Sequence, residues 1–286
     1  ALQFGSEQIA YLDAFAARDA SFGINDFYEA VLDSLRYENA LYAVPGRFQP
    51  ALIRYNPEIF DEVGLAYPQP GWTWNDFAAT AKALTLRESG NTQRWGYSED
   101  RPAVFRGRLA EALEDPAFAA AVHSDDPLAN AAVVELFRWY EDLYVNDRSA
   151  FSPSGGSGEY SGYTPGSLYT GQIARGKLAM WTDQLYEGAR RQGKPAPIPA
   201  NGSEGGAPIY MGAAWAIAAE TLHPDATWRW LNYLSRNPPP DAQQMLSARK
   251  SLVEKAAFWQ RLPSDEAIVY RYILDHLAPR PNFLQD

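Results

Sequence analysis

The sequence predicts an α/β protein with about two domains. Its 286 residues are ample for a buried core, and at roughly 150 residues per domain they predict about two domains. Apolar residues make up 46% and charged residues 21% of the chain, which is typical of folded globular proteins. Between residues 176 and 192 a strand-like segment, a turn and a helix-like segment follow one another, as expected of an α/β fold.

Spacing and capping residues predict the elements of the first 84 residues. Apolar residues at helical spacing indicate two helices, and Asn25 or Asp26 is expected to cap the second one. Pro57 is expected to begin a third helix, and Thr73 is expected to cap a fourth. The predicted elements are helices over 6–18, 25–35, 57–64 and 73–84, a hairpin over 36–45 that turns at Glu38-Asn39, and strands over 40–44 and 51–55.

The longest predicted helix starts at Asp126-Pro127 and carries Leu128, Leu136 and Trp139 on its core face. Residues 152–166, rich in Gly, Ser and Tyr, are typical of a loop. The remaining predicted elements are a short helix ended by Gly176, strands over 177–181 and 208–218, and helices over 184–192, 224–234, 241–248, 251–261 and 265–276.

Charge and cysteine content exclude several classes of protein. Asp and Glu total 35 against 25 Lys and Arg, and the net charge of -10 repels nucleic-acid phosphates and anionic lipid headgroups. Because no cysteine is present, disulfides, zinc–thiolate sites and cysteine nucleophiles are excluded. The longest uncharged apolar stretch, residues 208–219, is shorter than the ~20 residues of a membrane-spanning helix.

Patterns typical of catalysis or of a metal or cofactor site are missing from the sequence. His123, His223 and His276 are isolated from one another and form no paired metal-ligand pattern. The glycine-rich run 155–158 lacks the Gly-Lys-Ser/Thr of a phosphate loop. Pairs of adjacent acids are typical of solvated surfaces and helix caps, although glycosidases use two carboxylates. We therefore expect no cofactor and no metal ion.

Several short motifs occur in a characteristic order between Ile9 and about Pro281. They are Leu41-Tyr-Ala-Val-Pro45, Leu52-Ile-Arg-Tyr-Asn-Pro-Glu-Ile-Phe-Asp-Glu-Val-Gly-Leu65, Pro70-Gly-Trp-Thr-Trp-Asn-Asp-Phe77, Ala81-Lys-Ala-Leu-Thr85, Trp95-Gly-Tyr97, Gly176-Lys-Leu-Ala-Met-Trp181, Gly212-Ala-Ala-Trp-Ala-Ile217, Pro224-Asp-Ala-Thr-Trp-Arg-Trp-Leu231 and Ala248-Arg-Lys-Ser251. Together they resemble the extracellular solute-binding proteins of ABC importers, in the carbohydrate-binding group that includes maltose-binding protein.

The resemblance implies an α/β fold of the two-lobed, periplasmic-binding-protein-like type II, in which hinge strands cross between lobes that close on a sugar. It implies non-catalytic binding of a sugar or oligosaccharide and its delivery to the permease subunits of an ABC importer. The expected location is extracellular or periplasmic, with a membrane anchor through a missing N-terminus as an added expectation.

The resemblance also implies which residues bind the ligand. Sugar hydroxyls need hydrogen-bonding partners, and the apolar face of a sugar ring stacks on aromatic side chains. Gln49 is either a cleft-facing amide or an exposed loop amide. Asp183 and Tyr186 stand where related proteins bind hydroxyls and stack on sugars, and Trp181 either flanks them or fills the core.

Four more ligand-binding candidates follow from the same resemblance. Gly212 would let a ligand approach the backbone closely. Trp215 would either stack on the ligand or pack beneath the cleft. Arg101 and Arg249 are further candidates, and both residues are otherwise typical surface charges.

The resemblance begins inside the family pattern, because the segment at residues 9–15 is normally preceded by a strand, a helix and a strand of the first lobe. Lobe 1, residues 1–50 plus 208–240, is therefore expected to be incomplete. Lobe 2, residues 51–207 plus 241–286, is expected to be nearly complete. A sheet without its first strands exposes an edge, which predicts self-association.

Two other functions remain open from the sequence. The same lobes could serve as the ligand domain of a sensor or as a protein-interaction module. A glycan-degrading enzyme is the third possibility, and it would require a close pair of carboxylates.

Overall fold

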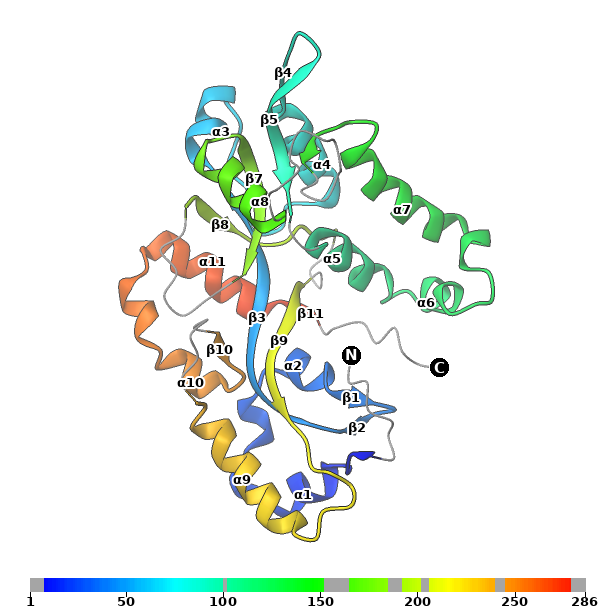
Figure 1. The fold of residues 1–286 in the computed structure, drawn as a ribbon, viewed down its shortest axis with the longest axis vertical. Coiled ribbons are helices and arrows are strands. Elements are labelled where there is room, and N and C mark those ends of the chain that lie inside the picture. Colours follow the sequence, from blue (N-terminus) through cyan, green and yellow to red (C-terminus); the bar gives the residue numbers. More distant parts are fainter. Residues whose placement is uncertain are drawn as a thin grey trace.

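Two long strands connect the two halves of the molecule. The computed structural model describes residues 8–99, 102–151, 165–184, 192–201, 206–239 and 245–278. Strand β3 (Val44–Tyr55) runs from one half into the other, and β9 (Ala207–Trp215) lies antiparallel beside it (Figure 1). At about 3.3 Å per residue, a strand of this length spans roughly 40 Å, which is enough to pass through both halves.

Strand β3 changes its partner about half-way along its length. Residues 44–50 pair with β9, whereas residues 51–55 pair with β7 (Leu178–Gln184). The short strands β8 (Lys194–Ala196) and β10 (Leu246–Ser247) also pair with β3. β3 is buried over nearly its whole length, as expected of a central strand covered on both faces.

The main sheet is mixed, which confirms the predicted α/β class. Among the described residues it has nine strands in the order β11-β9-β3-β7-β5-β4, with β10 and β8 beside β3 and β6 beside β5. β5 is parallel to both β6 and β7, and parallel neighbours require long crossover connections. The bounds not yet given are β4 (Leu86–Glu88), β5 (Asn91–Ser98), β6 (Ala150–Phe151) and β11 (Leu277–Ala278).

The N-terminal segment forms less helix than its pattern predicts. α1 spans Asp13–Arg18 and α2 spans Glu29–Asp33, with two 3-10 turns between them, Ala20–Phe22 and Ile24–Asp26. The predicted helix over 6–18 is wrong at residues 9–12, because Ala10 donates its backbone N–H to the carbonyl of Ile217. Asp26 does not cap α2, because its carboxylate accepts hydrogen bonds from Ser251 and Arg249 instead.

Between residues 36 and 84 the predicted turn and helix boundaries are confirmed, whereas the strand predicted over 40–44 ends at Leu41 and the strand predicted over 51–55 is the end of the longer β3. β1 (Arg36–Tyr37) and β2 (Ala40–Leu41) form a hairpin whose turn residues Glu38 and Asn39 have φ of 48° and 64°. Asn56 caps α3 (Pro57–Val63), which ends at Gly64 with φ of 74°. Thr73 and Asp76 form the capping box of α4 (Trp74–Leu84).

The region between residues 86 and 144 differs most from the sequence prediction. Strand β4 and helices α5 (Ala103–Ala112) and α6 (Pro116–Val122) have no predicted counterpart, and β5 is expected only at Trp95-Gly-Tyr97, where the resemblance implies a strand. α7 spans Ala131–Tyr144 and is capped by Asn130, so its predicted start at residues 126–127 is wrong. Leu128 lies in a 3-10 turn (Pro127–Ala129) and is 66% exposed, so it is not a core residue.

Four α-helices are described after residue 164. α8 spans Pro165–Ala174, α9 Pro224–Arg236, α10 Lys250–Glu254 and α11 Ser264–Asp275, with a 3-10 helix at Ala257–Arg261. The helix predicted over 241–248 is wrong at residues 246–247, which form β10. The predicted loop over 152–166 and the predicted helix over 184–192 lie mostly outside the described residues.

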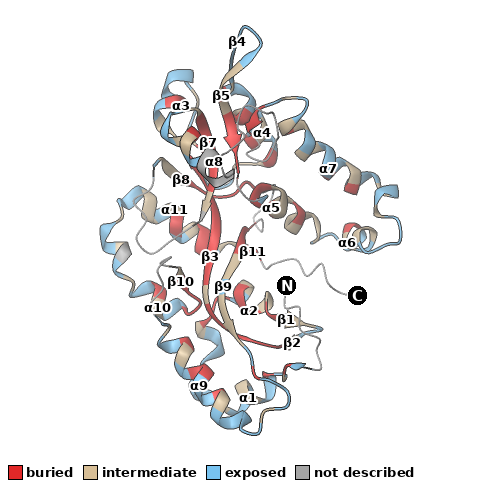
Figure 2. Cartoon of the chain, viewed as in Figure 1, coloured by how far each residue is buried: buried red, intermediate tan, exposed pale blue. Residues whose placement is uncertain are grey.

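Buried residues follow the central strands and the inner sides of the helices (Figure 2). One continuous apolar cluster extends from Leu12 and Phe22 in the first half, through Leu52 and Tyr97, to Leu274 in α11. The two halves therefore share a core along β3. No described helix is long and apolar enough to cross a membrane.

Candidate functional site

Gln49 and Tyr210 are neighbours at the centre of the molecule, where β3 passes between the halves. They are directly paired in the β3–β9 ladder, and directly paired residues lie on the same face of a sheet. Gln49 is only 3% exposed, and its buried Nε2 has no hydrogen-bond partner. Since an unsatisfied buried donor costs about 1–3 kcal/mol, this amide is a candidate for contact with a ligand.

Strand alternation identifies the other residues on this sheet face. Tyr55 lies six residues after Gln49 and therefore on the same face. It pairs with Met180, which in turn pairs with Tyr97 of β5. We call the face that carries Gln49, Tyr210 and Tyr97 the Gln49 face.

Helix α5 covers part of the Gln49 face and contributes a cation. The Arg106 guanidinium lies over the Tyr210 ring, 4.9 Å from its centroid. Gly107 lets α5 pack closely on its neighbours, because an added Cβ would lie 2.9 Å from Ile198 and 3.2 Å from Trp74. Gln49, Tyr210 and Arg106, which together we call the Gln49 site, thus come from three separate elements.

A buried carboxylate anchors the start of α5. Glu99, at the end of β5, accepts hydrogen bonds from the hydroxyls of Tyr97 (2.8 Å), Tyr140 (2.6 Å) and Tyr144 (3.3 Å), and from the backbone N–H of Val104 (3.2 Å). Burial raises the pKa of Glu99, although all four hydrogen bonds favour its charged form. Both carboxylate oxygens are therefore used inside the protein.

Asp183 lies on the opposite face of the sheet. It pairs with Leu52, which is three residues from Gln49 and so points the other way. Its carboxylate accepts a 2.8 Å hydrogen bond from Arg54 Nε, and the two side chains are 8% and 1% exposed. Arg54 also donates to the Tyr270 hydroxyl of α11 at 3.0 Å. Asp183 is thus the counter-ion of a buried arginine.

Trp181 belongs to the same opposite face, where it pairs with Arg54. It is buried in a small apolar cluster with Phe151 and Leu178. A Cβ added to Gly193 would lie 2.7 Å from its ring. Its surroundings are those of a core side chain.

Gly212 and Trp215 lie further along β9 and are closely packed. A Cβ added to Gly212 would lie 2.0 Å from the sulfur of Met245, so a side chain of the protein occupies the space beside this glycine. The Trp215 ring lies over Gly46, where an added Cβ would be 2.3 Å from it. Trp215 remains half-buried, which leaves part of its surface accessible.

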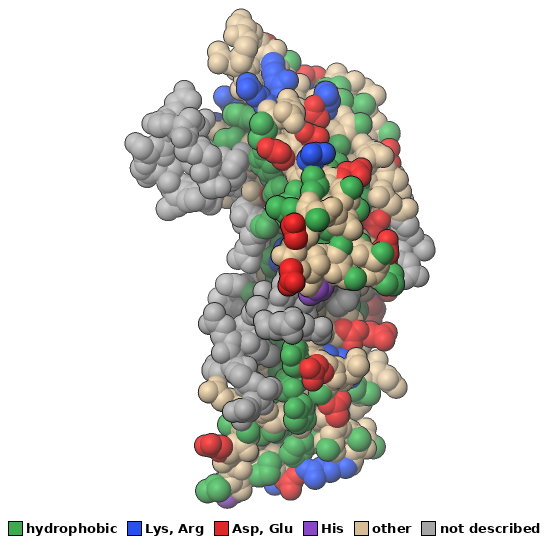
Figure 3. Space-filling view, turned by 90° about the vertical axis from the view of Figure 1, so that its right-hand side faces the viewer, with side chains coloured by type: hydrophobic (Ala, Val, Ile, Leu, Met, Phe, Trp, Pro, Cys, Tyr) green, Lys and Arg blue, Asp and Glu red, His purple; other side chains and the backbone are tan. Residues whose placement is uncertain are grey.

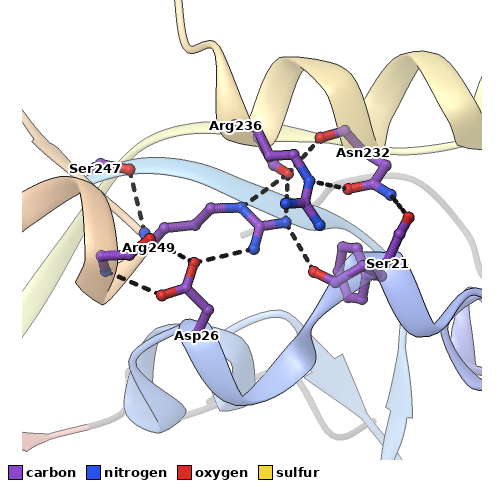
Figure 4. A network of polar contacts seen from close by, with 9 residues as sticks. Ser21, Asp26, Asn232, Arg236, Ser247 and Arg249 are labelled. Atoms are coloured by element: carbon purple, nitrogen blue, oxygen red, sulfur yellow. Dashed lines mark hydrogen bonds and ion pairs between the residues drawn. The ribbon is translucent and has the colours of Figure 1, made fainter.

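Arg249 is the centre of a buried network between α10, α9 and the 3-10 turns (Figure 4). Its guanidinium donates to Asp26 (3.2 Å), to Ser235 (2.8 Å) and to the backbone carbonyl of Phe22 (3.0 Å). It also lies 4.1 Å from the centroid of the Phe27 ring. With 2% of the residue exposed, Arg249 ties segments together and is not a surface charge.

The predicted site residues are therefore spread over several places. Gln49 lies where β3 passes between the halves, and Asp183 and Trp181 lie on the opposite face of the sheet. Arg249 lies in the network between α10, α9 and the 3-10 turns. Arg101 and Tyr186 lie outside the described residues. Sequence reasoning missed Tyr210, which its strand pairing with Gln49 could have indicated, and Arg106, whose helix gave no recognised signal.

The surface carries mixed charge. Figure 3 shows acidic side chains spread over both halves of one face, with basic side chains grouped near the β4–β5 end.

Among the described residues, no group of three or more metal-ligating side chains is placed to hold a metal ion. The Gln49 site brings together a side-chain amide, an aromatic ring and a guanidinium.

Comparison with known proteins identifies relatives of this chain. A family model described as bacterial extracellular solute-binding protein matches residues 6–260. A mannitol-binding protein of Pseudomonas aeruginosa is 26% identical over 184 residues, which make up 63% of this chain and 39% of that protein. The match thus spans about two fifths of the length of this relative.

Solved structures show the same fold. The sugar-binding protein MalE of Xanthomonas citri superposes with a TM-score of 0.67 at 18% identity, covering 97% of this chain and 70% of that one. A substrate-binding protein of Listeria monocytogenes in complex with cycloalternan gives 0.65 at 18% identity, covering 94% and 69%. The architecture is therefore the two-lobed fold of periplasmic sugar-binding proteins.

Proposed function

Because this chain belongs to the family of bacterial extracellular solute-binding proteins, we propose that it binds a sugar or polyol between its two lobes and delivers it to an ABC importer. The names of the relatives support this ligand class, since they include mannitol-binding and sugar-binding proteins. Closure of the lobes around β3 and β9 would enclose the ligand, as in other hinged binding proteins.

The buried, unpartnered Nε2 of Gln49 carries the proposal. A ligand hydroxyl that accepted a hydrogen bond from Nε2 would remove the cost of leaving this donor unsatisfied. Tyr210, half-buried beside it, offers an aromatic surface to an apolar sugar face. Trp215, together with Arg101 and Tyr186, remains a candidate for further contacts.

We propose binding without catalysis. A glycosidase needs two carboxylates free to act on the substrate. Glu99 is saturated by tyrosine hydroxyls and a backbone N–H, and Asp183 is paired with Arg54. These contacts support a binding role for the Gln49 face.

The proposed partners are the permease subunits of the importer and, through an exposed sheet edge, a second copy of the chain. The family description supports a location outside the cytoplasmic membrane; a membrane anchor is part of the proposal. We also propose that lobe 1 comprises residues 1–50 and a second segment that starts at residue 208 and continues past the expected boundary at residue 240, and that lobe 2 comprises the rest. The partner change of β3 near residue 50 supports the first boundary, whereas the bond from Arg249 to Asp26 favours a last boundary after residue 249.

Calorimetric titration with mannitol, maltose, mannobiose and glucose tests the proposal. We expect at least one of them to bind, and Gln49→Ala to weaken that binding about tenfold or more, which corresponds to loss of a hydrogen bond worth about 1.4 kcal/mol. Gln69→Ala is the matched control, because Gln69 is an exposed amide away from the site. Equal affinity of both variants would contradict the proposed site, and no binding by any sugar or polyol, neutral or acidic, would contradict the proposed ligand class.

A further inference from the structure

The charge of Arg106 is not balanced within the described part of the chain. The buried arginines Arg54, Arg94 and Arg249 each pair with a carboxylate, at 2.8, 2.9 and 3.2 Å. The half-buried Arg106 and Arg108 each lie over an aromatic ring instead, and Arg106 is the one that lies beside Gln49's strand partner Tyr210. Among the described residues, no carboxylate lies within ion-pair distance of Arg106, whose one recorded side-chain contact is the Tyr210 ring. A ring face attracts a cation without neutralising it, so the guanidinium retains its charge and its donors.

The nearest strand ends provide no free acid. Glu99 ends β5 on the Gln49 face, but its two oxygens already accept four hydrogen bonds. Asp183 near the end of β7 faces the other way and is paired with Arg54. These two acids are therefore engaged within the protein.

The Gln49 site thus offers more donors than acceptors. A guanidinium has five N–H donors and no acceptor, and the Gln49 amide adds two N–H donors and one acceptor. A sugar hydroxyl both donates and accepts, so a site for a neutral sugar is best matched by a mixture that includes carboxylates. A carboxylate or phosphate group only accepts at neutral pH, and a guanidinium binds either one through two parallel hydrogen bonds.

We infer that the ligand is an anionic polyol or sugar, whose carboxylate or phosphate oxygens contact Arg106 and Gln49. This inference rests on the proposed function and specifies its ligand. Closure of the lobes would bring the anionic group to the buried Gln49 amide, while the hydroxyls of the ligand contact the remaining parts of the cleft. The ligand is thus an oxyanion on a hydroxylated carbon chain, and experiment distinguishes a carboxylate from a phosphate.

Calorimetric titration with two matched sets of probes provides the test. Glucitol, gluconate and glucitol 6-phosphate share one carbon skeleton, and glycerol, glycerate and glycerol 3-phosphate share another. We expect at least one acid to bind tenfold or more tightly than its neutral counterpart, with gluconate or glycerate identifying a carboxylate ligand and the phosphates a phosphate ligand. The preference should weaken as salt is raised, because charge contributes to it.

The variant Arg106→Gln should abolish the preference for the acid, and Arg106→Lys should retain part of it. Arg229→Gln is the control, because it removes the same charge from an exposed position on α9; it should keep the preference. Thermal unfolding of each variant verifies that it is folded.

Three results would overturn the inference. The first is tighter binding of a neutral probe than of its acidic counterparts, and the second is a preference for the acidic probe that persists in Arg106→Gln. Both would leave the proposed function intact. The third is binding of a neutral sugar of the first panel together with no binding of any acidic probe, which would also leave the proposed function intact. If no probe of either panel binds, the proposed function fails as well.

Discussion

Asp183 illustrates how one side chain can fit two roles in a sequence and only one in a structure. From the sequence, this acid is expected to bind a ligand hydroxyl, because it follows a buried strand at a position where related proteins bind hydroxyls. In the folded chain the same carboxylate accepts from Arg54, which also donates to Tyr270. A buried arginine without its counter-ion would be strongly unfavourable, so the pair is needed for stability.

We predict that Asp183→Ala lowers the free energy of unfolding by about 3–5 kcal/mol, because it leaves the Arg54 charge buried and unpaired. Asp265→Ala removes the carboxylate of an exposed pair with Lys194 and should cost less than about 1 kcal/mol. Urea unfolding of both variants measures the difference. Unchanged stability of Asp183→Ala together with lost ligand binding would instead support a direct ligand contact.

Glu99 should make stability depend on pH. Its pKa in the folded protein is raised above the usual 4.5 by burial, so the folded state holds the proton more tightly than the unfolded state does. Its contribution to stability is therefore full below about pH 4.5 and is lost as pH rises through the folded pKa. The charged groups around it are few, since its recorded partners are tyrosines and one backbone N–H.

We predict that Glu99→Gln removes this pH dependence, because an amide stays neutral. Relative to the natural chain, the variant should gain stability as pH rises from 4.5 to 7. Urea unfolding of both proteins at four or five pH values gives the two slopes. Parallel slopes would mean that Glu99 has the same pKa in the folded and unfolded states.

At the scale of elements, local signals predicted those helix ends that depend on neighbouring residues alone. Thr73 and Asp76 form their capping box within a single turn, and Gly64 adopts the positive φ that ends α3. Asp26 had equally good capping chemistry, but it bonds to Arg249 and Ser251, more than 220 residues away. Contacts between distant segments were not visible in a local pattern.

Helix α4 and strand β5 pack at a distance that only glycine permits. A Cβ added to Gly96 would lie 1.7 Å from the carbonyl oxygen of Ala81. This close approach gives a physical reason for the glycine of the Trp95-Gly-Tyr97 motif. It also sets the position of Tyr97, which contacts Phe77 of α4 edge to face.

We predict that Gly96→Ala destabilises the protein by about 1–3 kcal/mol or more, because backbone must move to admit the methyl group. Gly171→Ala is the matched control. It lies within α8 with no atom near an added Cβ, so it should be neutral or stabilise by about 0.5–1 kcal/mol. Thermal unfolding compares the two, and similar melting temperatures would show that α4 shifts at little cost.

At the scale of the whole molecule, β3 and β9 decide how the halves are joined. In the described part of the chain, β9 pairs with β3 on one side, and β11 reaches only residues 207–208 on the other. The described part of the chain places no strand beside residues 209–215 on this side of β9, and most of their side chains are half-exposed. The solved relatives are longer, since this chain covers about 70% of the MalE structure.

A free edge beside apolar side chains predicts self-association by strand pairing. We expect light scattering to show dimers or larger species whose fraction grows with concentration. Ala213→Lys, which adds a charge to the edge, should reduce association, whereas Ala120→Lys on the exposed side of α6 should not. A monomer at high concentration, or equal effects of both variants, would contradict the prediction.

The sequence by itself determined the α/β class, the family and the local boundaries, because composition, motif order and capping residues act over short stretches of chain. It also named Gln49 as a candidate for ligand contact, which stays a prediction. Only the tertiary structure decided which polar groups are free: it paired Asp183 with Arg54, enclosed Arg249 among Asp26, Ser235 and Phe22, and brought Arg106 over Tyr210. The physical reason is that a charge is neutralised by whatever group lies within a few ångströms in space, and sequence separation does not reveal that distance.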